Sequence, residues 1–154
     1  MLPYTSLSYT LNHILLLRLL MAFPFKKVKT LHNFLYIAAA KSKVNDYPAA
    51  YVFIKLKNGA FNYQAYKIIE DFKRADLFSE TDNLSLNKQG KEIYYSFAPV
   101  LKYHKFPQVC LNLANNYGNN LWQVNHEIYF NPSFKEKKVG EKIIFQPETQ
   151  KLTN

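Results

Sequence analysis

Four histidines and one cysteine are the residues of this chain whose types could do chemistry, and their spacing predicts no site. The histidines are His13, His32, His104 and His126, and none lies at an interval typical of zinc ligands from a cysteine, a carboxylate or another histidine. His126 and Glu127 are adjacent, so their side chains would point to different sides of a helix. Cys110 has no second cysteine to pair with, and a cysteine of this kind is most often a small buried apolar residue.

The acidic residues and the glycines also favour a protein that is not an enzyme. The acids are scattered, and no two of them are spaced as a general acid and a general base would be. The chain has 4 glycines and no glycine-rich phosphate-binding loop. A nucleophile made of Cys110 and a histidine would depend on tertiary contact alone. We therefore expect no catalytic residues, no metal and no cofactor.

Lysines and tyrosines alternate in the segment that follows the first expected helix. The formal net charge is +9, and most of it falls in residues 1–60, where Asp46 is the one acid. A basic surface with tyrosine anchors fits an acidic partner, either a protein or a nucleic acid, although an ordinary solvated surface has the same composition. The residues expected to bind a protein partner are Lys41, Lys43, Tyr47, Tyr51, Lys55, Lys57 and Tyr63.

A second hypothesis is that the chain binds DNA. Asn62, Gln64 and Lys67 stand early in an expected helix, where major-groove readers present such side chains. Lys55, Lys57, Lys88 and Lys91 would then hold phosphates. Against this hypothesis, the helix over 62–76 has balanced charges, and the following segment "SETDN" is acidic and would repel phosphates.

The elements that must position these residues are mainly helical. A chain of 154 residues with 48% hydrophobic residues is long enough for one domain with a core. Apolar residues at helical spacing predict helices over 29–43, 62–76, 88–103, 107–115 and 121–129. Residues 51–56 fit a strand or a short buried helix, "NG" at 58–59 predicts a turn, and 142–145 fits a short strand.

Local signals refine the two central helices. Asn62 and Asn87 are suited to cap the helices that they precede, and Asp76 stands where a helix commonly ends on a left-handed residue. We expect Phe72 and Trp122 in the core, because each lies on the apolar face of its helix.

Residues 77–86 predict a β-wing between two helices. The apolar "LF", the polar "SETDN" and the alternating "LSL" form a short strand, a turn and a second strand. The order of helix, wing and helix is typical of a winged-helix domain. We therefore predict a single domain that is mainly α with a small β-wing and is winged-helix-like.

Both ends of the chain are expected to lie outside this domain, which would span 26–130. The apolar run from Ile14 to Phe25 is interrupted by Arg18, is too short for a membrane span and lacks a signal-peptide pattern. Residues 1–25 would be an N-terminal extension. Either its first 20 residues lie upstream of a true start at Met21, or it contains an apolar helix that packs on the domain. Residues 131–154 would be a tail. With one cysteine and no membrane span, the expected location is the cytoplasm, and the oligomeric state is left open.

Several segments resemble the Panacea domain family, which includes antitoxin and phage-associated proteins of the SocA and GepA types, and the related YwgA-type proteins. They are "KTLHNFLY" at 29–36, "FIKLKNGAFNYQAYKIIEDFKRADLF" at 53–78, "LSLNKQGKE" at 84–92 and "NYGNNLWQVNHE" at 116–127. The chain departs from the family pattern where Gly-Pro is Gly59-Ala60, the helix-ending glycine is Asp76 and the threonine cap is Asn87. The resemblance implies a non-enzymatic antitoxin or adaptor that binds a protein, commonly a toxin encoded alongside it.

Overall fold

The fold is described from a computed structural model, which places residues 9–42, 52–79 and 84–145. The α-helices are α1 (Leu11–Ala22), α2 (Val28–Lys41), α3 (Tyr63–Arg74), α4 (Lys88–Phe97), α5 (Lys105–Tyr117), α6 (Val124–Glu127) and α7 (Pro132–Lys135). The strands are β1 (Phe53–Leu56), β2 (Gly59–Asn62) and β3 (Lys142–Ile143). Segments of 3₁₀ helix join the later helices: η2 (Ala98–Tyr103), η3 (Gly118–Gln123) and η4 (Ile128–Phe130).

The sheet of the described chain is antiparallel, in the order β2-β1-β3. β1 and β2 form a tight hairpin in which Leu56 pairs with Gly59, as the turn signal at 58–59 predicts, and Phe53 pairs with both Asn62 and Ile143. Strands β1 and β2 therefore precede α3, and β3 comes from the last described part of the chain, so none of the three lies in the predicted wing. In the segment expected to form the wing, the pairing among described residues is one bridge between Phe78 and Leu86. The mainly helical class is confirmed, whereas the winged-helix arrangement is not.

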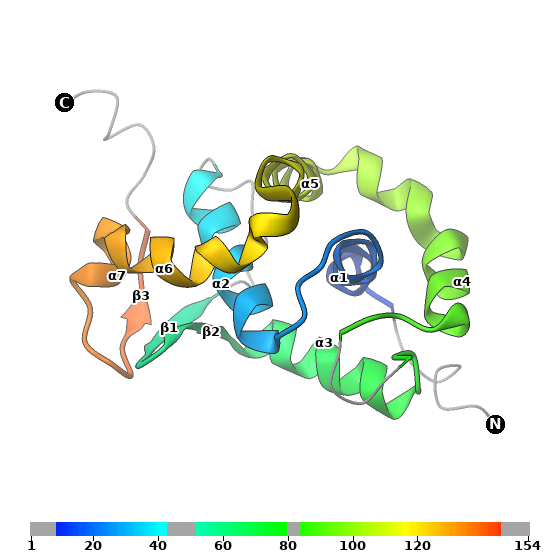
Figure 1. Cartoon of the computed structure of the whole chain (residues 1–154), viewed down its shortest axis with the longest axis horizontal. Helices are drawn as coiled ribbons and strands as arrows, with labels where there is room; N and C mark the ends of the chain where they lie inside the picture. Colours follow the sequence, from blue (N-terminus) through cyan, green and yellow to red (C-terminus); the bar gives the residue numbers. More distant parts are fainter. Residues whose placement is uncertain (1–8, 43–51, 80–83, 146–154) are drawn as a thin grey trace.

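Helix α1 lies in the interior of the molecule. Figure 1 shows it enclosed by α3, α4 and α5, and its apolar side chains between Ile14 and Leu20 are buried in the same core as those of α2 and α3. Arg18, which interrupts the apolar run, places its guanidinium 5.9 Å from the centre of the Tyr94 ring on α4. Residues 11–22 thus form a helix that packs in the core of the domain. The packed core therefore extends across the domain boundary that was predicted at residue 25.

The core also crosses the boundary expected at residue 130. The buried ring of Tyr36 on α2 lies between Phe53 of β1 and Phe134 of α7, with centroid distances of 5.3 and 5.9 Å. The Tyr36 hydroxyl donates a hydrogen bond to Asn131 Oδ1 at 2.6 Å. Ile143 is buried as well. Residues 131–145 are therefore part of the packed structure.

The predicted helix caps are confirmed. Asn62 Oδ1 accepts a hydrogen bond from Ala65 N at 2.7 Å, and Asn87 Oδ1 accepts one from Gly90 N at 2.9 Å. Asp76 has a φ of 57° and ends α3 in the left-handed region, as expected. Phe72 is fully buried, as predicted.

The core position predicted for Trp122 is wrong, because its side chain is 53% exposed. The expected helix over 121–129 is broken into η3, α6 and η4. The inward positions of these segments are Leu121 of η3, Val124 of α6 and Ile128 of η4, which are all buried. Trp122 points outward and contacts the His126 ring edge-on at 5.7 Å.

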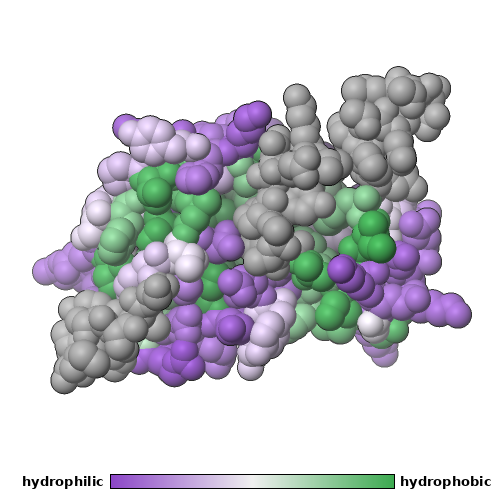
Figure 2. Space-filling model, turned by 180° about the vertical axis from the view of Figure 1, so that it is seen from behind, coloured by the Kyte–Doolittle hydropathy of each residue, from purple (hydrophilic) through white to green (hydrophobic). Residues whose placement is uncertain are grey.

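Hydrophobic side chains also reach the surface. Seen from behind, they gather in two areas, one at the end that carries the hairpin and one at the end that carries α4 (Figure 2). Within the described ranges, no helix combines the length and the apolar content that crossing a membrane requires.

Candidate functional site

An apolar pocket of about 270 Å³ opens where the first turn of α2, the hairpin and the first turn of α3 meet. We call it the hairpin pocket. It is lined by Val28, Lys29, His32, Leu56, Asn58, Gly59, Ala60, Phe61 and Tyr66. Its volume is below the roughly 300 Å³ at which small-molecule pockets usually begin, so it fits one side chain or a fragment of similar size.

The hairpin owes its position to Asn33, a buried polar side chain on α2. Asn33 Oδ1 accepts a hydrogen bond from Ala60 N at 2.8 Å, and its Nδ2 donates to Asn125 Oδ1 at 2.8 Å. Gly59 passes so close that an added Cβ would lie 2.3 Å from Asn33 Oδ1, and its φ of 144° also favours glycine. One side chain of α2 thus holds the turn of the hairpin and links it to α6.

His32 forms the inner wall of the pocket. It is 3% exposed, and its ring stacks on that of Phe61 with a centroid distance of 5.1 Å and an interplanar angle of 9°. Its Nδ1 accepts a hydrogen bond from Asn62 N at 2.9 Å. Because burial disfavours the charged ring, the pKa of His32 is lowered to about 4, and the imidazole is neutral at neutral pH.

Aromatic side chains form the outer wall. The Tyr66 ring lies 5.9 Å from that of Phe61 and 6.0 Å from that of Tyr63, with which it stacks. Lys67 Nζ lies 5.6 Å from the centre of the Tyr63 ring. Tyr63 and Tyr66 are 59% and 43% exposed, so both can be covered further by a bound molecule.

The charge around the hairpin pocket is positive. Lys29 lines it, Lys57 is exposed in the hairpin turn, and no acidic residue is among the lining residues. Neither lysine takes part in an ion pair with another described residue. The positive charge would therefore favour binding of a side chain whose neighbours in the partner are acidic.

The residues expected to bind a protein partner are only in part at this pocket. Tyr63 and Lys57 are exposed beside it. Lys55 turns inward, where its Nζ donates to Phe134 O at 3.0 Å and lies 4.5 Å from the centre of the Phe134 ring. Lys41 lines a separate cavity of about 550 Å³ with Lys102 and Lys105. Lys43, Tyr47 and Tyr51 lie outside the described residues.

The residues expected to bind DNA do not share one surface. Asn62 is fully buried, and its side chain caps α3 and donates to Val52 O at 3.2 Å. Gln64 is half-buried, while Lys67 is exposed. Lys88 and Lys91 belong to α4, which lies at the opposite end of the molecule from the hairpin that carries Lys55 and Lys57 (Figure 1).

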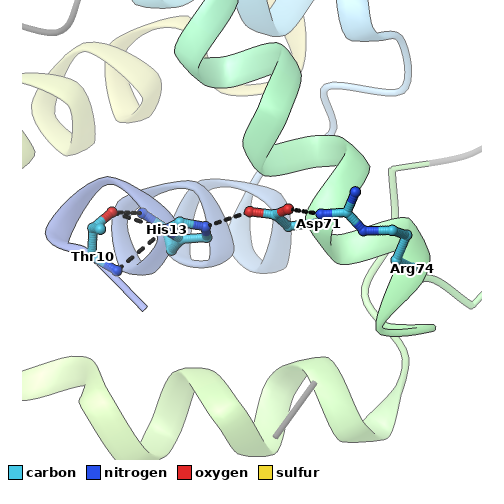
Figure 3. Close-up of polar contacts among 4 residues, drawn as sticks. All are labelled: Thr10, His13, Asp71 and Arg74. Carbon is cyan, nitrogen blue, oxygen red and sulfur yellow. Dashed lines mark hydrogen bonds and ion pairs between the residues drawn. The ribbon is translucent and has the colours of Figure 1, made fainter. Parts of the chain in front are cut away.

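A second polar cluster joins α1 to α3, as Figure 3 shows. His13 Nδ1 accepts from Thr10 N at 3.2 Å and lies 2.8 Å from Thr10 Oγ1, so the ring proton is on Nε2, which donates to Asp71 Oδ2 at 2.9 Å. Asp71 also pairs with Arg74. A hydroxyl, an imidazole and a carboxylate in series are the parts of a nucleophilic triad. Here the hydroxyl caps the helix of its own histidine, accepting from His13 N at 3.3 Å, so these contacts explain how α1 begins and how it is attached to α3.

Among the residues that the structure places, no three His, Cys, Asp or Glu side chains are grouped so that they could hold a metal ion. Cys110 is fully buried, and burial raises the pKa of its thiol well above its usual range.

No protein-family model, curated protein or solved structure matches the chain. The resemblance to Panacea-type proteins therefore stays a prediction. The hairpin pocket is defined by its geometry alone.

Most residues of this site were not predicted from the sequence. His32, Asn33, Phe61 and Tyr66 were not expected to contribute to it. A weak signal does exist, since His32 and Asn33 are polar residues next to Leu31 and Phe34, which face the core.

Proposed function

We propose that this protein is a non-enzymatic binding protein whose partner, another protein, inserts an apolar side chain into the hairpin pocket. The observation that carries the proposal is the pocket itself, which has apolar walls, tyrosines at its edge and exposed lysines beside it. An apolar centre with an aromatic border and a polar rim is typical of an interface hot spot.

The charges indicate what kind of segment would bind. Lys29 and Lys57 would attract acidic residues on either side of the inserted side chain, mainly by raising the rate of encounter. The antitoxin-type role implied by the Panacea resemblance is a setting in which such a module would act, with a toxin encoded alongside it as the partner. The DNA-binding alternative has less support, because Asn62 is used as a helix cap and the candidate phosphate contacts are divided between two ends of the molecule.

The test is capture from native lysate after nuclease treatment, with wild-type protein, Tyr66→Ala and Tyr95→Ala compared side by side. Tyr95 is an exposed tyrosine on α4, so Tyr95→Ala is a matched control far from the pocket. We expect one protein to be retained by wild type and Tyr95→Ala through moderate salt, and to bind Tyr66→Ala about 30-fold more weakly, as for a hot-spot residue.

Two results would contradict the proposal. One is equal retention of the partner by both tyrosine variants, which would place the interface elsewhere. The other would come from a parallel capture without nuclease: nucleic acid that is retained and elutes at low salt, with no protein retained, would favour the DNA-binding alternative.

A further inference from the structure

His32, which lines the hairpin pocket, carries a hydrogen-bond donor. A backbone N–H can only donate, so the bond from Asn62 N shows that His32 Nδ1 carries a lone pair. The neutral ring must then carry its proton on Nε2. The wall of an otherwise apolar pocket thus contains an N–H group with a fixed direction.

This N–H has no partner within the described parts of the chain. Among the buried side-chain nitrogen and oxygen atoms described, Asn12 Oδ1 alone lacks both a hydrogen-bond partner and access to solvent. His32 Nε2 therefore keeps some access to solvent, although the residue is 3% exposed. Since His32 lines the hairpin pocket, we infer that this access is through the pocket. A ligand that filled the pocket without an acceptor would strip this donor of water and leave it unpaired.

We propose that the hairpin pocket selects a tyrosine side chain of the partner, with the phenol oxygen accepting a hydrogen bond from His32 Nε2–H. This inference rests on the proposed function and adds to it the kind of side chain that is bound. The rings of Phe61 and Tyr66 supply apolar walls for the tyrosine ring. Asn58, an exposed lining residue, carries an amide oxygen that is the candidate acceptor for the phenol hydrogen. A carboxylate is a poorer occupant, because the apolar walls would strip it of water.

The experiment compares p-cresol with toluene, which are the side-chain analogues of tyrosine and phenylalanine. Both are titrated into the full ¹⁵N-labelled chain at pH 7, with the backbone amides of Ala60 and Phe61 and the ring nitrogens of His32 followed by NMR. We expect p-cresol to bind roughly 3- to 10-fold more tightly than toluene, and the Nε2–H resonance to move with p-cresol only.

His32→Phe is the matched variant, since it keeps a ring beside Phe61 and removes Nε2–H. In this variant we expect p-cresol and toluene to bind equally. If His32→Phe does not fold, the comparison of the two probes on the wild-type protein still decides the question.

The other outcomes separate this inference from the proposed function. Equal binding of both probes to wild type, or a preference for p-cresol that survives in His32→Phe, overturns the role of His32 and leaves an apolar docking pocket. Binding of neither probe at its solubility limit overturns both proposals.

Discussion

Among single residues, His32 shows how a polar side chain can be buried, because two contacts accommodate its neutral ring. It stacks on Phe61 and accepts a hydrogen bond from the backbone of Asn62, so the neutral ring is well accommodated. The protonated ring would lose that acceptor and would have to be desolvated, which explains the lowered pKa. The same two contacts give the ring the orientation on which the proposed selectivity depends.

This lowered pKa predicts a loss of stability in mild acid. Histidine in the unfolded chain titrates near its ordinary value of about 6.5, whereas His32 in the folded chain titrates at about 4. Between these values the unfolded state binds a proton that the folded state does not. The free energy of unfolding should therefore fall as the pH drops from 6.5 toward 4, by about 2 kcal/mol at pH 5, and stay constant above 6.5 on account of this group.

Urea denaturation at pH 7.5, 6 and 5 would measure the effect. His32→Asn is the control, because its Oδ1 stands at the position of the histidine Nδ1, can still accept from Asn62 N and does not titrate. We expect the variant to lose less stability than wild type over this range. The same pH dependence in both proteins would show that His32 does not titrate as described.

At the scale of elements, the end of α3 shows how an unusual residue is accommodated. Leu77 N donates to Phe72 O at 3.0 Å, and Asp76 N donates to Lys73 O at 3.1 Å, which is the pattern of a Schellman motif. The left-handed position of that motif, usually glycine, is Asp76. Asn87 Nδ2 donates to Asp76 O at 2.7 Å, so the cap of α4 also closes the end of α3.

Substitutions at Asp76 should therefore change stability in opposite directions. Glycine adopts the left-handed conformation without steric cost, so Asp76→Gly should raise the free energy of unfolding by about 0.5 kcal/mol. Asp76→Ala should lower it by about 1 kcal/mol, because a Cβ without a local polar contact is disfavoured there. Denaturant midpoints at an unchanged m-value would report both effects, and destabilisation by Asp76→Gly would contradict this account of the helix end.

At the scale of the whole molecule, the core is built around α1. The helix contacts α3, α4, α5 and η2, and its leucines are among the most buried side chains described. Without it, the apolar faces of those elements would be open to water. A translation start at Met21 stays a prediction. Mass spectrometry that identifies the N-terminal peptide of the native protein would test it.

A chain that begins at Met21 should fail to fold cooperatively. The buried leucines it lacks would each cost about 2–5 kcal/mol as single alanine substitutions, so their combined loss exceeds the stability of an ordinary domain. The measurement is thermal unfolding of the shortened chain, of Leu17→Ala and of Leu11→Ala. Leu17 is fully buried and Leu11 partly, so Leu17→Ala should be the more destabilising of the two. A cooperative transition of unchanged midpoint in the shortened chain would show that α1 is dispensable.

Features whose causes lie within a few residues could be predicted from the sequence. The caps at Asn62 and Asn87, the left-handed Asp76 and the turn at Gly59 depend on local hydrogen bonds and steric limits, and all were predicted. Helical periodicity located most of the helices, because burial on one side of a helix leaves a repeating pattern. Of the candidate site, the sequence indicated the hairpin segment, Lys57 and Tyr63.

The contacts between distant segments could not be predicted from the sequence and are seen only in the folded chain. An apolar run such as α1 has the same sequence pattern whether the helix lies at the centre of the core or at its edge. Strand β1 pairs not only with β2 but also with β3, which lies far from it in the sequence. The hairpin pocket needs the first turn of α2, the hairpin and α3 together, and the tautomer of His32 is set by the backbone of Asn62. Burial and strand pairing depend on the partners that the rest of the chain supplies, and no local spacing of residues records that choice.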